Sequence, residues 1–563
     1  MRAPAKEPAI ATNVHGNTEG LKPSALRGVR KLADRRVPAG VVVSPELGRR
    51  MCELSRQVGR QLGVLVDRQG RVTRVIVGDA HQLFIPDLTR ARAGAGRFRG
   101  LRLVHTHLRG EPLTRDDLTD LALLRLDAVV AIQARPDGLP GWAELGALDP
   151  DAPEGAAEPW FVERVGSIYG WGLDWLEFIG DLERRFRARD AAVRLPGAEA
   201  CVVIGVTTGD LEEAAESLDE LERLAHSAGL QVLDRVLQRR RRFDPRFVVG
   251  KGKLAEILVG AMQRGVDVLV FDQELSPGQL RNIAAATDLK VVDRTQLILD
   301  IFAQRARSRE GKLQVELAQL RYRKPRLAIM PTAMSRLTGG IGGRGPGETR
   351  LEINRRRADE RETRLARQLR KLGRDRALRR ARRSRVGLPQ VAIVGYTNAG
   401  KSTLLNTLTR SAVDAEDKLF ATLDPTSRRM RFPAEREIVL TDTVGFIRNL
   451  PEALVEAFRS TLEETREADL LVHVLDASDP RIDTHDSEVR RTLEALGCSD
   501  TPRITVLNKV DRIDPDLREV LVRRFRGLAV SAATGEGLDR LIAELDHRIF
   551  QERARRSARE AMP

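Results

Sequence analysis

The stretch VAIVGYTNAGKST, residues 391–403, joins a short apolar run to a glycine-containing loop. Gly395, Gly400, Lys401 and Ser402 fit the pattern G-x-x-x-x-G-K-[ST], in which a buried strand leads through the loop into a helix. The backbone N–H groups of such a loop can hold phosphates, the lysine can reach the β- and γ-phosphate oxygens, and the serine can bind Mg²⁺. This stretch therefore predicts a nucleotide-binding α/β domain.

Three further motifs follow in the order that a GTP-binding domain requires. An apolar strand ends in DTVG, where Asp442 can hold the Mg²⁺ shell and the N–H of Gly445 can sense the γ-phosphate. A second strand ends in NKVD, and the carboxylate of Asp511 can accept hydrogen bonds from guanine that adenine cannot offer. SAATG then places Ser531 and Ala532 near the base. Together the four motifs predict a GTP-binding domain.

The sequence identifies the residues that support hydrolysis less completely than those that bind the nucleotide. LFATLDPTS, residues 419–427, offers both Thr422 and Thr426 as the threonine that closes on Mg²⁺, and the pattern alone does not choose between them. Phe446 follows DTVG where Ras-like proteins have a glutamine that orients water. Because phenylalanine cannot form that hydrogen bond, we expect slow intrinsic hydrolysis that needs help from elsewhere.

The 563 residues are enough for about three domains. Alternating strand-like and helical runs predict an α/β fold: a P-loop GTPase domain, an α/β parallel-sheet domain with a long helical hairpin, and an extra N-terminal α/β domain. We expect residues 1–45 to be poorly ordered. The expected segments are an N-terminal extension at 46–190, an α/β subdomain at 198–300, the hairpin at 301–386 and the GTP-binding domain at 389–555.

The predicted hairpin contains a second glycine-rich loop, GGIGGRGPGETRLE, starting at Gly339. One long helix is expected from Leu297 to Lys324, ended by Pro325, and a second from about Thr349 to Arg383. The loop lacks the GK[ST] ending and follows no strand, so it does not predict a second nucleotide site. Between Leu351 and Val386 there are fifteen Lys or Arg and five acidic residues. This local excess indicates an RNA partner better than the net charge of +15, which an arginine-rich composition alone can produce.

At these residues the chain resembles the HflX family of ribosome-binding GTPases, over about Val202 to Ile549. The resemblance rests on the nucleotide motifs and on the long strings VVDRTQLILDIFAQRARSREGKLQVELAQL, GGIGGRGPGETRLE and LFATLDPT. It implies a GTP hydrolase that binds the large ribosomal subunit and splits stalled or idle ribosomes, with ribosome-stimulated turnover of GTP to GDP and phosphate. It also implies that Thr422 is the switch threonine and that the glycine-rich loop reaches rRNA near the peptidyl-transferase centre.

On this basis the predicted catalytic residues are Lys401, Thr422 and Gly445, and the predicted Mg²⁺ ligands are Ser402 and Thr422. The predicted nucleotide contacts come from five segments of the GTP-binding domain: Gly395, Tyr396, Thr397, Asn398, Ala399, Gly400, Lys401, Ser402 and Thr403; Phe420, Ala421, Thr422, Leu423 and Asp424; Asp442, Thr443, Val444 and Gly445; Asn508, Lys509, Val510 and Asp511; Ser531 and Ala532. K⁺ is a further candidate cation, because Asn398 stands where potassium-stimulated GTPases of related type have an asparagine.

The N-terminal extension contains LVHTHLRGEPLTRDDL, residues 103–118, which resembles the H-x-H…S-x-x-D metal motif of JAMM/MPN metalloproteases. The gap is one residue shorter than usual, and Arg60 stands where those enzymes have their glutamate. Because zinc-bound water needs a general base, we expect a degenerate, non-catalytic domain without zinc. The alternative is a vestigial zinc site formed by His105, His107 and Asp117.

The three cysteines are widely spaced, and the sequence has no apolar run of about twenty residues and no secretory signal. These features favour a cytoplasmic protein without a membrane span. We expect a monomer whose partners are GTP or GDP and the large ribosomal subunit. A different class of function, a nucleotide-gated RNA-binding scaffold for ribosome assembly, is the alternative.

Overall fold

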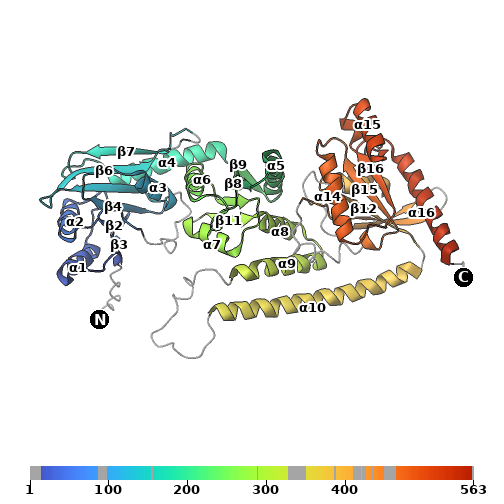
Figure 1. Ribbon diagram of the computed structural model, residues 1–563, viewed down its shortest axis with the longest axis horizontal. Helices are drawn as coiled ribbons and strands as arrows, with labels where there is room; N and C mark the ends of the chain where they lie inside the picture. Colours follow the sequence, from blue (N-terminus) through green and yellow to red (C-terminus); the bar gives the residue numbers. More distant parts are fainter. Residues whose placement is uncertain are drawn as a thin grey trace, which may run out of the picture. The chain divides into compact units, whose positions relative to one another are not determined.

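A computed structural model describes residues 14–85, 98–153, 156, 158–287, 289–327, 350–385, 388–409, 420, 426–432, 436–448 and 465–560. The chain forms two compact units: residues 1–218 with 230–292, and residues 219–229 with 293–563. Figure 1 shows the α/β architecture that the strand–helix alternation predicts. Helix α5 (Leu211–Ser227) contributes its first eight residues to the first unit and the rest to the second.

The first unit begins with a seven-stranded mixed sheet in the order β1-β3-β2-β4-β5-β6-β7. Its strands are β1 (Val14–Gly16), β2 (Leu62–Asp67), β3 (Val72–Val77), β4 (Leu101–His107), β5 (Ala128–Ala134), β6 (Pro140–Leu148) and β7 (Trp160–Val165). Its helices are α1 (Pro23–Arg30), the 3₁₀ turn η1 (Lys31–Asp34), α2 (Pro45–Val58), α3 (Arg115–Leu123) and α4 (Trp175–Val193).

The expectation that residues 1–45 are poorly ordered is wrong for residues 14–45. Strand β1 pairs in parallel with β3, and α1 and η1 bury Val29 and Leu32 completely in the core of this domain. Ala25, Val29 and Leu32 recur at i, i+4 and i+7, the spacing of a helix face, and Val41, Val42 and Val43 are consecutive, so the sequence did contain a signal for this segment. The segment is ordered because neighbouring strands and α2 supply the rest of the core.

The same unit contains a four-stranded sheet in the order β11-β10-β8-β9. β8 pairs in parallel with both β10 and β9, as expected for strand–helix alternation. Its elements are β8 (Glu199–Thr207), β9 (Leu230–Arg239), α6 (Lys251–Gln263), β10 (Val268–Phe271), α7 (Pro277–Ala286) and β11 (Lys290–Asp293).

The second unit holds the helical hairpin. Its helices are α8 (Arg294–Arg305), α9 (Arg309–Leu327) and α10 (Arg350–Arg385), and Figure 1 shows α9 and α10 side by side. The single long helix expected over Leu297–Lys324 is in fact two. The chain is extended at Ala306, and the side chain of Ser308 accepts a hydrogen bond from Gly311 N at 2.8 Å and so starts α9.

Pro325 does not end α9, which continues to Leu327. A proline in the last turn removes only one backbone donor, and the helix tolerates it there. Leu365 of α10 is fully buried, and ion pairs join the two helices, among them Arg321 Nε with Glu362 Oε1 at 3.0 Å. The hairpin is therefore held by a narrow apolar seam flanked by charges.

The GTP-binding domain is built on a six-stranded sheet in the order β13-β14-β12-β15-β16-β17, parallel except for the pair β13–β14. Its strands are β12 (Gln390–Gly395), β13 (Thr426–Arg431), β14 (Glu437–Asp442), β15 (Leu470–Asp476), β16 (Arg503–Asn508) and β17 (Leu528–Ala529). Its helices are α11 (Lys401–Thr409), α14 (Ile482–Ala495), η3 (Val510–Arg512), α15 (Pro515–Phe525) and α16 (Leu538–Glu560). The carboxyl ends of β12, β14, β15 and β16 carry the predicted nucleotide motifs, where ligands of open α/β sheets bind.

The buried N-terminal segment gives a stability prediction. Leu32→Ala leaves a cavity in the core and should destabilise the N-terminal domain by about 2–5 kcal/mol. Hydrogen exchange of α2 and β3 in rising denaturant measures this, with the exposed Arg30→Ala as the matched control. If Leu32→Ala exchanges like the control, residues 14–45 do not belong to this core.

Candidate functional site

The loop between β12 and α11 has backbone positions that only glycine fits. Gly395 and Gly400 have φ values of +157° and +88°, and a Cβ at either would lie 2.3 Å from Val474 O or from Asn508 Nδ2, respectively. Asn398 also has a positive φ of 63°, a conformation that asparagine adopts more readily than most residues. The loop therefore packs closely against Val474 of β15 and Asn508 of β16 before α11 begins.

Lys401 is buried at the first position of α11. Its Nζ donates to Tyr396 O at 2.8 Å, inside the loop. Burial lowers its pKa to about 8, with Asp442 opposing that shift and Lys509 adding to it. A Cβ on Gly445 would lie 2.9 Å from Lys401 Nζ, so the DTVG backbone closely approaches the lysine. The fold thus brings together Lys401 and Gly445, two of the predicted catalytic residues.

Ser402 and Asp442 form the part of the site suited to a divalent cation. Ser402 Oγ donates to Asp442 Oδ2 at 2.6 Å, and Asp442 is fully buried at the end of β14. A hydroxyl and a carboxylate are the hard oxygen donors that Mg²⁺ prefers, usually completed by water and substrate phosphates. The residues present therefore fit a Mg²⁺ ion. Thr422, together with Ala421, Leu423 and Asp424, lies outside the described residues.

Two phenylalanines flank the phosphate side of the site. Phe446 is buried, and its backbone bonds the loop in both directions: Thr397 N to Phe446 O at 2.8 Å, and Phe446 N to Gly395 O at 3.2 Å. Its ring can orient no water. Phe420 has a φ of 59° and packs edge-on against Phe302 of α8, with ring centroids 4.6 Å apart.

Asn508 organises the part of the site where the guanine base is expected to bind. Its amide donates to Ala399 O and accepts from Ala532 N, both at 2.9 Å, so it links the phosphate loop to the SAATG loop. Lys509 has a φ of 64°, and its Nζ lies 2.7 Å from Asp476 Oδ2. Asp511 is exposed in η3, and its carboxylate can accept from a ligand.

The remaining predicted contacts lie on the same elements. Thr403 continues α11, Thr443 donates to Ile393 O at 2.7 Å, and Val444 is buried. Val510 and Ser531 are also buried near Asn508. Apart from Phe420, which packs on Phe302 of α8, the described members of the predicted nucleotide set lie at the carboxyl ends of β12, β14, β16 and β17 or in the segments that follow them.

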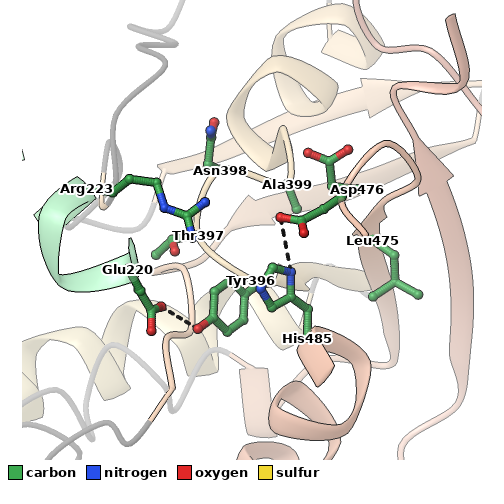
Figure 2. A pocket seen from close by; sticks show the side chains of 10 residues that line it. Glu220, Arg223, Tyr396, Thr397, Asn398, Ala399, Leu475, Asp476 and His485 are labelled. Atoms are coloured by element: carbon green, nitrogen blue, oxygen red, sulfur yellow. Dashed lines mark hydrogen bonds and ion pairs between the residues drawn. The ribbon is translucent and has the colours of Figure 1, made fainter. Parts of the chain in front are cut away.

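The sequence did not predict a second layer of residues beside the phosphate loop. Figure 2 shows the pocket there, lined by Glu220, Arg223, Tyr396, Thr397, Asn398, Ala399, Leu475, Asp476, Asp479 and His485. Tyr396 donates its hydroxyl proton to Glu220, accepts from Arg448 N at 2.7 Å, and stacks on His485 with centroids 3.8 Å apart. No motif marks Glu220 in the sequence, because it lies 176 residues from Tyr396.

Arg294 completes this layer. Its Nη2 lies 2.5 Å from Glu220 Oε2, and both side chains are 6% exposed. The same nitrogen donates to Arg448 O at 3.3 Å, directly after the DTVG motif. Burial, and secondly the charge of Glu220, raise the pKa of Tyr396 well above its ordinary value, so its hydroxyl remains a donor.

In the N-terminal domain the structure brings together His105, His107 and Asp117. Their ligand atoms lie within 4.8 Å of one another, and the two His Nε2 atoms are 2.8 Å apart. His107 Nδ1 lies 2.6 Å from Glu111 O, which fixes the proton on Nδ1 and leaves Nε2 as a lone-pair donor to the cluster. Burial, and secondly the charge of His107, lower the pKa of His105 to about 4, which keeps it neutral. Arg60 bonds the backbone of Asn17 and Glu19 instead.

The glycine loop with its lysine, the Ser402–Asp442 pair and the NKVD strand end define a P-loop GTPase, an enzyme that binds and hydrolyses GTP. Family models match the chain in three consecutive regions, described as GTP-binding GTPase N-terminal (residues 215–303), GTP-binding GTPase Middle Region (305–383) and 50S ribosome-binding GTPase (390–509).

Curated relatives indicate the same class of GTPase as the family models. GTPase HflX of Lacrimispora saccharolytica is 51% identical over 348 residues, 62% of this chain and 82% of that protein. GTPase HflX of Escherichia coli is 45% identical over 61% of this chain and 82% of that protein. The chain therefore belongs to the HflX GTPase family.

Among solved structures, a GTP-binding protein from the hyperthermophilic archaeon Sulfolobus solfataricus in complex with GDP is 25% identical. The similarity covers 63% of this chain and 99% of that chain, with a TM-score of 0.34. None of the described helices is long and apolar enough to cross a membrane.

Asp511, which is expected to contact guanine, gives the prediction for this site. In Asp511→Asn an amide replaces the carboxylate that accepts from guanine, so GTP affinity should fall at least about tenfold and affinity for xanthosine triphosphate should rise. Titration of fluorescent analogues of both nucleotides measures this, with Asp516→Asn, an exposed acid of α15, as control. Unchanged GTP affinity in Asp511→Asn would remove Asp511 from guanine recognition.

Proposed function

We propose that this protein is a cytoplasmic GTPase that binds the large ribosomal subunit and splits stalled or idle ribosomes, with ribosome-stimulated turnover. Membership of the HflX family supports the ribosomal partner, as does the description of the matched GTPase domain model as 50S ribosome-binding. The hairpin supports an RNA target, because Arg355, Arg356 and Arg357 are exposed near the start of α10. Exposed arginines on one helix suit contact with phosphates.

The observation that carries the proposal is the position of α8 in the second unit. Arg294, at its first residue, bonds Arg448 O after DTVG, and Phe302, near its end, packs on Phe420 before the switch segment. Only three residues separate α8 from α9 of the hairpin. A helix that contacts both flanks of the GTP site and leads into the hairpin can pass a change at the γ-phosphate to an RNA-contacting element.

Within the nucleotide site we assign the roles as follows. Lys401 holds the β- and γ-phosphates, the N–H of Gly445 contacts the γ-phosphate, and Ser402 with Thr422 binds Mg²⁺, which neutralises charge on the phosphates when bound. Asn398 is the residue that could hold a K⁺ ion beside them. Gly342, Arg344 and Gly345 of the glycine-rich loop lie outside the described residues, and we assign that loop to rRNA near the peptidyl-transferase centre.

The alternative is a nucleotide-gated RNA-binding scaffold that assists ribosome assembly. Sedimentation separates the two functions, because only a splitting factor converts intact ribosomes into subunits. With GTP the full chain should shift intact ribosomes to subunits in a sucrose gradient. Ribosomes that stay intact at saturating protein and GTP would contradict splitting.

The hairpin gives a prediction with two separable arms. Replacing Arg355, Arg356 and Arg357 with alanine should weaken ribosome binding and flatten its salt dependence, by about 0.7–0.9 in the log–log slope per lost phosphate contact. Gly342→Val with Gly345→Val should instead reduce splitting sharply and binding only modestly, because a β-branched residue blocks close backbone approach.

The charge control is alanine at Arg491, Arg523 and Arg524, which are exposed on α14 and α15 of the GTP-binding domain. That triple variant removes the same charge but should keep the parental salt slope. If the glycine variants split ribosomes at the parental rate, the loop is only a connector.

A specific observation also favours a metal-binding function for the N-terminal domain. His105, His107 and Asp117 can supply two imidazole nitrogens and a carboxylate, and the bond from His107 to Glu111 O is the outer contact typical of a metal-bound histidine. We propose that these residues hold a zinc ion, against the expectation from the sequence. Peptidase activity is not proposed, since Arg60 occupies the place of the base.

Zinc analysis of the purified full chain tests this assignment. The parent should contain about one zinc per chain, and His105→Ala with His107→Ala should contain none. His81→Ala, an exposed histidine of the same domain, is the control and should retain zinc. A parent that neither contains zinc nor takes it up during dialysis would overturn the site.

A further inference from the structure

We propose that Arg223, one turn before the end of α5, is a catalytic residue of GTP hydrolysis: its guanidinium donates hydrogen bonds to the phosphates of bound GTP. Figure 2 shows Arg223 pointing toward Thr397 and Asn398 of the phosphate loop. The proposal depends on GTP hydrolysis alone and not on ribosome splitting, so the two can fail independently.

One polar atom of the pocket, the hydroxyl oxygen of Thr397, is buried without a hydrogen-bond partner among the described residues. Thr397 as a whole residue is 6% exposed. A buried hydroxyl without a partner is destabilising, and a bound ligand can relieve this. Thr397 and Asn398 belong to the glycine loop that holds the phosphates, so the ligand nearest to them is the nucleotide.

The carboxylates around the pocket are paired with other cations, which leaves the guanidinium of Arg223 available to a ligand. Each carboxylate of the pocket has a cationic partner: Glu220 pairs with Arg294 at 2.5 Å, Asp476 with Lys509 at 2.7 Å and Asp479 with Arg481 at 3.1 Å. Arg223 is exposed, and in the described part of the chain it makes only a weak bond within its helix, from Nε to Asp219 O at 3.4 Å. Among the described residues, its guanidinium therefore forms no ion pair with these carboxylates and is available to a phosphate group.

The position of Arg223 is fixed by its neighbour one turn earlier. Glu220 and Arg223 stand three residues apart, on the same face of α5. Glu220 is tied to the phosphate loop by Tyr396 and to α8 by Arg294, both buried. This docking gives the end of α5 a defined place beside the loop, so Glu220 and Tyr396 act as positioning residues for Arg223.

The chemistry of the site calls for such a group. In hydrolysis a water oxygen attacks the γ-phosphorus, the bond to the β–γ bridging oxygen breaks, and GDP leaves with that electron pair while the water proton passes to phosphate. Negative charge grows on the bridging and γ-oxygens, and an arginine placed there raises the rate about 10³–10⁵-fold in other GTPases. Phe446, buried and apolar, supplies no such stabilisation.

Single-turnover GTP hydrolysis by the full chain, with Mg²⁺ and without ribosomes, tests the proposal. Arg223→Ala should lower the rate at least about 100-fold, while the Kd for GTP changes less than about threefold, since the contact forms mainly in the transition state. Arg223→Ala should also fail to form the GDP–aluminium fluoride complex. Arg223→Lys should recover little, because lysine lacks the planar fork.

His226→Ala, an exposed residue on the next turn of α5, is the matched control and should keep the parental rate. Tyr396→Phe removes the hydroxyl that holds Glu220 and should lower kcat with KM nearly unchanged. A rate for Arg223→Ala equal to the control overturns the proposal.

Discussion

The nucleotide site of this protein is built around one buried carboxylate, that of Glu220. It receives the guanidinium of Arg294 at 2.5 Å and the hydroxyl of Tyr396, in surroundings that leave both charged side chains 6% exposed. Removing one partner of such a pair commonly costs about 3–5 kcal/mol, because the other charge remains buried without compensation. Three parts of the chain that are distant in sequence, α5, α8 and the phosphate loop, are therefore held together wherever this contact is intact.

The consequence lies in what each partner touches next. The Tyr396 hydroxyl also accepts from Arg448 N, and Arg294 donates to Arg448 O, so both sides of one peptide segment after DTVG are bonded to the same network. Gly445 stands three residues before Arg448 and approaches Lys401 closely. A movement of Gly445 would therefore act on a segment whose end is held by these bonds. The network therefore connects the chemistry of the nucleotide to α8 and, through α8, to the hairpin.

The GTP-binding domain and the helical hairpin could be predicted from the sequence, because both depend on patterns within short stretches of the chain. The glycine loop, DTVG and NKVD each carry their function within a few residues. Leucines spaced at i, i+4 and i+7 mark the hairpin helices: Leu313, Leu317 and Leu320 in the first and Leu365, Leu369 and Leu372 in the second. The break at Ala306 was missed because Leu313, Leu317 and Leu320 continue the apolar spacing of α8, and only the cap at Ser308 interrupts the helix. The ordered segment at residues 14–45 was missed because its core partners lie on strands and helices further along the chain.

The coupling residues could not be predicted from a single sequence. Glu220 and Arg294 are ordinary helix residues 74 positions apart, and Glu220 is 176 positions from Tyr396. Their importance arises only from the tertiary fold, which desolvates them together. The same holds for Arg223, whose availability depends on three ion pairs that occupy the neighbouring carboxylates.

The central claim is that the state of the nucleotide reaches α8 and α9 through the Tyr396–Glu220–Arg294 network. Hydrogen exchange of residues 294–327 in the full chain, compared between GDP and a non-hydrolysable GTP analogue, tests it most directly. The parent should show a clear difference between the two states, and Tyr396→Phe, which keeps the ring but loses the hydroxyl, should abolish it. Identical exchange of α8 and α9 in both nucleotide states of the parent would contradict the claim.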